Sequence, residues 1–301
     1  MGNSIKSVSI FRIEDPELEL TEDQIEKEGY IHSLSTYDLQ GNIIKEVDFN
    51  IVSTIEHQTE FEYNDKNYLV KVNQYMEDEV LTEWRELVRN EEGRVDKELL
   101  HYLDGSIDVI EYSYNEANQL ISRIQTNSDE EIEKQENNVY EDGKLIKEEI
   151  IDQDGNVTVL NTYSYAEKGI LEESIHELFN DGKSTRLIHA FDEAGRRQKS
   201  LRYNDKNQLV EISRYVIDDM DRVVQIEDED QHKKSLTTIE YDDAGNIVSQ
   251  LERDKNDEII SSVERRYSQD NRVLESKVYM SGQGHRQDQE YTLIYKYEYF
   301  E

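Results

Sequence analysis

The chain has 301 residues, of which 69 are acidic and 34 are basic, so its formal net charge is −35. That charge excludes ordinary binding to DNA or RNA backbones, which depends on Lys and Arg, and it disfavours anionic membrane surfaces. The lack of cysteine excludes disulfides, thiol catalysis and thiolate metal sites.

Only 35% of the residues are hydrophobic, yet the chain has 20 tyrosines and a single proline. Disordered chains are poor in aromatic residues, so the tyrosines favour a folded protein. A folded chain with so few apolar residues needs a shape with much surface for each core residue. The composition therefore favours an extended repeat architecture with a thin core.

Residues 1–36 differ from the rest of the chain and lack its repeating pattern. Thr21 before an acidic stretch, or Asp15 before Pro16, is typical of the start of a short helix. We expect this segment to be an N-terminal cap that covers the first strand edge of the array. No secretion signal and no run of about 20 apolar residues is visible, so we expect a cytoplasmic protein without a membrane partner.

From residue 37 onward one pattern recurs, in which an aromatic residue and a polar turn residue precede a Gly or Asn and then an aliphatic pair. The segments that start at Tyr37 and Tyr241 read YDLQGNII and YDDAGNIV. The copies at Arg89 and Ile217 have lost the aromatic residue. Ten copies follow one another in steps of 24 to 26 residues, starting at positions 37, 63, 89, 114, 140, 165, 191, 217, 241 and 267. Such a regular period indicates a tandem repeat.

One position of each copy holds a residue that tolerates positive φ, as a short hairpin loop requires. These residues are Gly41, Asn67, Gly93, Asn118, Gly143, Gly169, Gly195, Asp221, Gly245 and Asn271. A second turn lies about halfway between them, as at Asp104-Gly105, Asp154-Gly155 and Asp181-Gly182. Each unit therefore contains two strands and two turns, which is typical of an antiparallel meander.

The strands alternate apolar and polar residues, most clearly where Tyr291, Leu293, Tyr295, Tyr297 and Tyr299 share one face. The stretch 77–89 is ambiguous, because Val80, Trp84, Leu87 and Val88 have helical spacing while the repeat register predicts a strand; we predict a strand. The overall prediction is an all-β fold of tandem antiparallel β-hairpin repeats, about ten units of ~26 residues over residues 37–301 in a single domain. We expect a long curled or spiral open sheet with tyrosines inside, and exposed terminal strands that could pair between chains through residues 291–300.

The segments YDLQGNII, FDEAGRRQ and YDDAGNIV, with their spacing, resemble the YD repeats of the Rhs and teneurin families over residues 37–280. The shorter copy YEDGKLIKE at 140–148 also resembles the MORN-variant repeats of antitoxin-like proteins. The resemblance implies hairpins that form a long spiralling sheet, sometimes around a toxin domain. The chain has few units for a large cargo and lacks the Asp-Pro-x-Gly-Leu element that closes such shells.

No residue can be assigned as catalytic, cofactor-binding or metal-binding. No pair among the seven histidines has a spacing typical of zinc sites; they are His32, His57, His101, His176, His189, His232 and His285. The acidic runs at residues 218–221 and 227–230 contain carboxylates that suit calcium, but they match no calcium-loop motif and are better explained as solvated hairpin turns. We find no nucleophile, phosphate-loop or dinucleotide motif, so we expect a protein that is not an enzyme and needs no cofactor.

The function that we expect is binding of another protein. The acidic charge suits a basic partner, because complementary charge speeds association and favours the correct partner. In a specific version, the chain is an immunity protein that neutralises a basic polymorphic toxin domain. The alternative is a structural relative of a cell-surface YD-repeat shell, whose tyrosine face contacts carbohydrate.

Overall fold

The computed structural model describes residues 4–15, 18, 20–77, 80–167, 169–282 and 287–301, which form an all-β molecule with one short helix. The helix α1 spans Glu22–Glu28. The strands are β1 (Ile5–Ile13), β2 (Tyr30–Tyr37), β3 (Ile43–Phe49), β4 (Ile55–Tyr63), β5 (Leu69–Met76), β6 (Val80–Arg89), β7 (Val95–Tyr102), β8 (Ile107–Tyr114), β9 (Leu120–Thr126), β10 (Ile132–Glu141), β11 (Lys144–Asp152), β12 (Val157–Tyr165), β13 (Leu171–Asn180), β14 (Lys183–Phe191), β15 (Arg197–Tyr203), β16 (Leu209–Ile217), β17 (Val223–Asp230), β18 (Lys234–Tyr241), β19 (Ile247–Asp254), β20 (Ile259–Tyr267), β21 (Val273–Met280) and β22 (Gln289–Tyr299).

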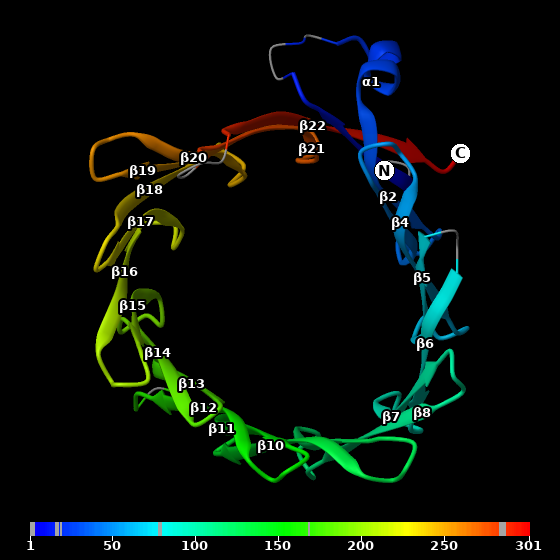
Figure 1. The fold of residues 1–301 in the computed structure, drawn as a ribbon, viewed down its shortest axis with the longest axis vertical. Helices are drawn as coiled ribbons and strands as arrows, with labels where there is room; N and C mark the ends of the chain where they lie inside the picture. The colour runs from blue at the N-terminus through cyan, green and yellow to red at the C-terminus, as the bar shows by residue number, and fades with distance from the viewer. Residues whose placement is uncertain (1–3, 16–17, 19, 78–79, 168, 283–286) are drawn as a thin grey trace.

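These strands form one closed antiparallel ring (Figure 1). Each strand from β2 to β22 pairs with its neighbours in sequence, and β1 pairs with β2 on one side and with β22 on the other. The pairing of β1 with β22 joins Ile10 to Tyr295 and Val8 to Tyr297. Each of the 22 described strands therefore has a partner on both sides.

The open curled or spiral sheet expected from the repeat is thus wrong. An open sheet ends in rows of unpaired backbone N–H and C=O groups, which cost free energy or attract other chains. Here β1, at residues 5–13, fills the gap between β2 and β22 and satisfies both rows. The terminal strand β22 is not a free edge, so the expected pairing between chains through residues 291–300 loses its basis.

The N-terminal segment also contains the expected helix. Thr21 is the N-cap of α1, and the side chain of Gln24 accepts a hydrogen bond from the backbone N–H of Thr21 at 3.0 Å. Pro16 lies outside the described residues.

The ambiguous stretch 77–89 is a strand from residue 80 onward, as the repeat register predicted, while residues 78 and 79 are outside the described part. Among the described residues no helix is long and apolar enough to cross a membrane.

The repeat turns follow the predicted chemistry. All ten predicted turn residues have positive φ, from +58° at Asn271 to +88° at Gly41. The Asp or Asn that opens a turn usually accepts two backbone N–H groups with one side-chain oxygen; Asp242 accepts those of Ala244 at 3.0 Å and Asn246 at 2.8 Å. These bonds satisfy amides that the strand ladder leaves unpaired, so each turn is fixed by its own sequence.

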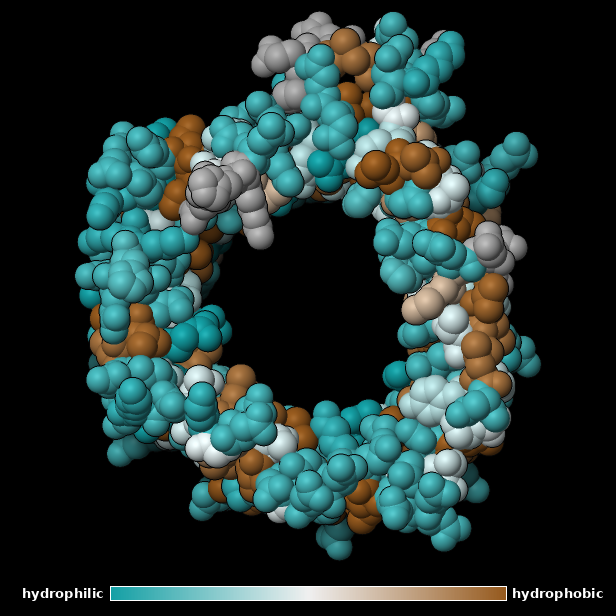
Figure 2. All heavy atoms as spheres, viewed as in Figure 1, coloured by the Kyte–Doolittle hydropathy of each residue, from teal (hydrophilic) through white to brown (hydrophobic). Residues whose placement is uncertain are grey.

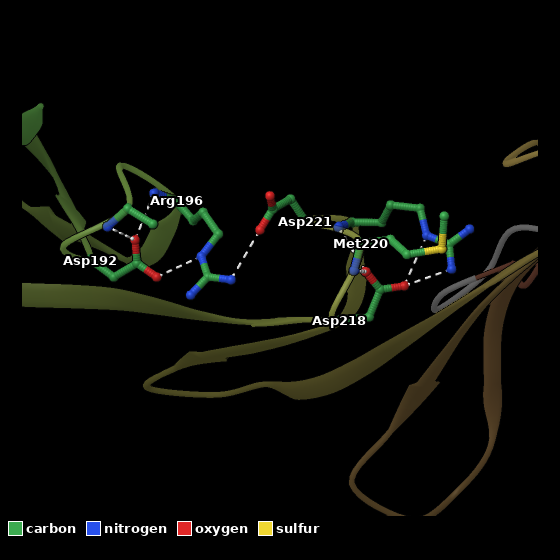
Figure 3. Close-up of polar contacts among 7 residues, drawn as sticks. Asp192, Arg196, Asp218, Met220 and Asp221 are labelled. Carbon is green, nitrogen blue, oxygen red and sulfur yellow. Dashed lines mark hydrogen bonds and ion pairs between the residues drawn. The ribbon is translucent and has the colours of Figure 1, made fainter.

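Side chains also join successive turns along one rim of the ring. Arg196 donates to Asp192 in its own turn at 2.7 Å and to Asp221 in the next turn at 3.0 Å (Figure 3). In that next turn Asp218 accepts hydrogen bonds from the guanidinium of Arg222. Asn246 and Asn271 form an equivalent contact two repeats later. The rim is therefore a ladder of polar contacts from turn to turn.

The ring is a single layer with almost no core. The buried apolar residues among those described are Ile13, Ile25, Val47, Leu100 and Ile110. The space-filling view shows a ring that is open through its middle and mostly hydrophilic on the side shown (Figure 2). Both faces of the sheet meet solvent, which accounts for the low hydrophobic content of the sequence.

Candidate binding face inside the ring

The inner face of the ring can be identified from the helix. Helix α1 lies outside the ring (Figure 1), and Lys296 of β22 donates a hydrogen bond to its Glu26 at 2.9 Å. Lys296 therefore lies on the outer face of β22. Side chains alternate between faces along a strand, so Tyr295 and Tyr297 lie on the inner face. Residues directly opposite one another on paired strands share a face, so the register carries this assignment around the ring.

A row of small polar residues crosses the inner face from β13 to β18, and we call it the serine row. Each member lies directly opposite the next: Ser174, His189, Ser200, Ser213, Asp228 and Ser235. The four serines are 3%, 5%, 8% and 9% exposed in that order. Four of the six members are serines, so the row presents mainly hydroxyl groups on the inner face.

Two histidines anchor one end of the serine row. The imidazole Nδ1 of His189 lies 2.7 Å from the hydroxyl of Ser200, which is 3.3 Å from the hydroxyl of Tyr215. The ring of His176 is 5.3 Å from that of His189 between centroids, and its Nδ1 contacts the Asn161 amide oxygen at 3.0 Å. This end of the row is a connected hydrogen-bond network.

Burial disfavours the charged form of both histidines. Desolvation lowers the pKa of His189 to about 4, and the nearby Arg197 adds to the effect. Desolvation also lowers the pKa of His176. The contact of Ser200 with His189 has the length of a nucleophile–base pair, but a base with so low a pKa accepts a proton poorly at pH 7. The geometry favours a role in hydrogen bonding.

A hollow of about 220 Å³ opens on the inner face beside this network. Arg202 and Glu211 form an ion pair at its wall, with the guanidinium Nε 2.8 Å from the carboxylate. The lining residues are Leu187, His189, Ser200, Arg202, Glu211, Ser213 and Tyr215. The hollow thus offers hydroxyl, carboxylate and aromatic groups to a ligand inside the ring.

Carboxylates line the inner face next to this hollow, and we call them the acidic wall. They are the inward residues of β16–β19: Glu211, Asp228, Asp230, Glu252 and Asp254. These four strands contain three basic residues, Arg214, Lys234 and Arg253, and the alternation of the strands places all three on the outer face. Within these four strands every inward charge is therefore negative, while Arg202 of the neighbouring β15 pairs with Glu211 at one end of the wall.

A second acidic hollow of about 200 Å³ lies at β2–β4. Its inward residues include Glu46, Asp48 and His57, and Asp48 lies directly opposite His57. Lysines also lie beside the acidic wall, where Lys233, Lys234 and Lys255 line a hollow of about 480 Å³ together with Glu252 and Asp254.

The acidic runs noticed in the sequence separate in the structure. Residues 218–221 form a rim turn, as the simplest reading expected. In the run 227–230, Glu227 and Glu229 point outward, where both contact Arg214, while Asp228 and Asp230 belong to the acidic wall. Among the described residues no group of three or more His, Asp or Glu is placed to hold a metal ion.

The histidines are dispersed, except for the pair in the serine row. His57 and His189 lie in β4 and β14, as expected for sheet residues. His285 lies outside the described residues.

The serine row was not identified from sequence, because single serines within strands carry no motif. Ser174 and Ser200 share one position of the repeat, nine residues after the starts at 165 and 191, and this offset is a signal that could have revealed those two; Ser213 and Ser235 do not share it.

No family model and no curated protein matches the chain. Among solved structures it is similar to TcdB2-TccC3 without its hypervariable C-terminal region, with 12% identity and a TM-score of 0.37, over 87% of this chain and 16% of that one. It is also similar to a porin-like protein from Bacteroides uniformis, with 8% identity and a TM-score of 0.33, over 99% and 98% of the two chains. The chain thus spans about a sixth of the first of these proteins. Likeness at such low scores carries no argument about function.

Proposed function

We propose that this chain is a non-enzymatic binding protein whose partner is a basic protein. In its specific version it is an immunity protein that neutralises a basic toxin domain. The observation that supports the proposal most strongly is the acidic wall, in which β16–β19 direct carboxylates into the ring and their basic residues outward. A net charge of −35 adds a long-range attraction for a cationic partner.

The ring is wide enough to admit part of such a partner. Strands spaced about 4.8 Å apart and tilted by about 40° give a 22-stranded ring a diameter of about 40 Å between opposite backbones. Side chains reduce the opening, but a helix with its side chains is only about 10–12 Å across. An extended or helical segment of a partner can therefore reach the inner face.

Both faces of the sheet carry ion pairs, which supports contact with water or with a polar partner. On the outer face Arg266 pairs with Glu275 at 2.8 Å. On the inner face Arg85 approaches Glu98 at 3.5 Å. In the immunity version, the protein and the toxin domain meet in the cytoplasm, where the toxin would act.

The test is an affinity capture from the source cells with the tagged full chain, at low and then at high salt, read by mass spectrometry. The proposal expects one or a few basic proteins at low salt, with recovery that falls at high salt, because screening weakens attraction between exposed charges. Capture of no basic protein at either salt concentration would contradict the proposal. Glycan binding on an array, without protein capture, would favour the structural, carbohydrate-contacting alternative.

A further inference from the structure

We propose that the acidic wall and the adjoining part of the serine row form the docking surface for a cationic polypeptide segment, rich in Lys or Arg, that enters the ring. This inference rests on the proposed function and adds the face, the strands and the chemistry of the segment. It makes β16–β19 the recognition surface and leaves the outer face, although acidic, without a specific role.

Asp228 is the central group of this surface. It lies between Ser213 and Ser235 across the strands. Among the described residues it forms neither an ion pair nor a hydrogen bond through its side chain. The other four carboxylates of the wall have partners. Glu211 pairs with Arg202, Glu252 accepts a hydrogen bond from the Ser261 hydroxyl at 3.1 Å, and Asp230 and Asp254 each accept backbone N–H groups in turns. Asp228 is therefore available to an ammonium or guanidinium group from outside the chain.

Ser213 offers a second polar group beside Asp228. Ser213 is 8% exposed and lines the hollow of about 220 Å³. Its hydroxyl has no hydrogen-bond partner within the described part of the chain. Ser235, 9% exposed on the other side of Asp228, is likewise without a side-chain partner there. The two hydroxyls flank a free carboxylate and are not cut off from solvent, so both can form hydrogen bonds with a ligand at this place.

The spacing suits an extended peptide with flexible basic side chains. Asp228 and Asp254 are two strands apart on the inner face, which corresponds to about 10 Å. Alternate residues of an extended strand are about 7 Å apart, and the four-carbon stem of lysine bridges the difference. A peptide laid along the serine row can thus place ammonium groups at successive carboxylates while its backbone meets the serine hydroxyls.

The probe for the test is a fluorescein-labelled octalysine peptide, titrated by fluorescence anisotropy at low salt. The double variant Asp228→Asn, Glu252→Gln removes two inward charges from strand interiors with near-isosteric residues. The matched control, Glu240→Gln with Glu264→Gln, removes two exposed charges from outward positions of β18 and β20. Both variants have the same net charge, so a general loss of attraction affects them equally.

We expect the inner-face variant to weaken peptide binding about tenfold and the outer-face control to change it less than about twofold. Equal effects of the two variants would overturn the inference. Photo-crosslinking of the peptide to the wild-type ring gives a second readout, in which adducts must map to β16–β19 and adducts on outward residues would count against it. If the ring captures a basic protein from cells but the two variants behave alike, the inference fails while the proposed function stands.

Discussion

The hydroxyl of Tyr165 donates a hydrogen bond to the backbone carbonyl oxygen of Leu145, at 2.9 Å, two residues beyond the last ladder pair of β11 and β12. The tyrosine that starts most repeats therefore caps a carbonyl that the sheet leaves unpaired. Six other tyrosines make an equivalent bond at 2.8–3.0 Å: Tyr63, Tyr114, Tyr140, Tyr241, Tyr267 and Tyr297. The aromatic position of the repeat thus carries a hydrogen-bond function as well as packing.

Replacing Tyr165 with Phe keeps the aromatic side chain and removes the hydroxyl. We expect the free energy of unfolding to fall by about 0.5–1.5 kcal/mol, the usual net value of one such bond. Chemical denaturation measures the change. The control is Tyr203→Phe, since the Tyr203 hydroxyl makes no hydrogen bond within the described residues; an equal loss in both variants would show that the Leu145 contact contributes nothing.

Arg89 performs the tyrosine role in a copy that has lost its aromatic residue. Its guanidinium donates to the carbonyl oxygen of Leu69 at 3.1 Å and to that of Gly93 at 3.0 Å. We expect Arg89→Ala to destabilise the protein by about 1–3 kcal/mol, as for hydrogen bonds from a charged group, and Arg89→Tyr to recover most of the loss. Thermal unfolding of the two variants is the measurement, and an Arg89→Tyr variant as unstable as Arg89→Ala would refute the equivalence.

The turn glycines are needed for their backbone conformation. Gly105 has φ +86°, and a Cβ at this position would meet no heavy atom within 4 Å. Gly105→Ala should therefore cost about 1 kcal/mol from the left-handed conformation alone. The companion variant Ser53→Gly, at a position with φ +58° and no side-chain hydrogen bond among the described residues, should leave stability unchanged or raise it slightly. Denaturation midpoints of the two variants measure these changes. An Ala variant as stable as wild type would show that the turn adopts another backbone conformation without cost.

Stability should depend on pH through His189. Its pKa is about 4 in the folded protein and 6.5 in an unperturbed histidine, so the unfolded chain takes up the proton first. The free energy of unfolding should therefore decrease as pH falls from about 6.5 to about 4, and this contribution should level off below pH 4.

The variant His189→Gln should flatten the decrease between pH 6.5 and 4, while His232→Gln, in an exposed rim turn, should leave it in place. Denaturation curves at a series of pH values provide the comparison. An unchanged slope in His189→Gln would show that other groups cause it.

Local features of the fold were readable from sequence because each is fixed within one turn or one strand. The positive φ of Gly41 and Asn271, the strand at residues 80–89 and the helix start at Thr21 all depend on neighbouring residues. Closure of the ring was not readable, because it joins Ile10 to Tyr295 across almost the whole chain. No local pattern in residues 5–13 shows which strand they will meet.

The inner face was equally hidden from sequence. Alternation could be read within a strand such as β22, but which face turns inward depends on closure. The run 227–230 looked like a uniform acidic turn, whereas the strand directs Asp228 inward and Glu227 outward toward Lys234 at 2.6 Å. The serine row emerges only when the registers of β13–β18 are combined.

Closure of the ring by β1 is the central claim, since the inner face exists only if the ring closes. Ser9 and Lys296 lie directly opposite each other across β1 and β22, and the chain has no cysteine of its own. We would replace both with cysteine and measure disulfide formation in the monomer by non-reducing electrophoresis and peptide mapping, with Ser9→Cys, Lys277→Cys as the control pair. The closed ring predicts an efficient intramolecular disulfide for the first pair and none for the control. Free thiols in both variants, with monomers intact, would show that the sheet is open.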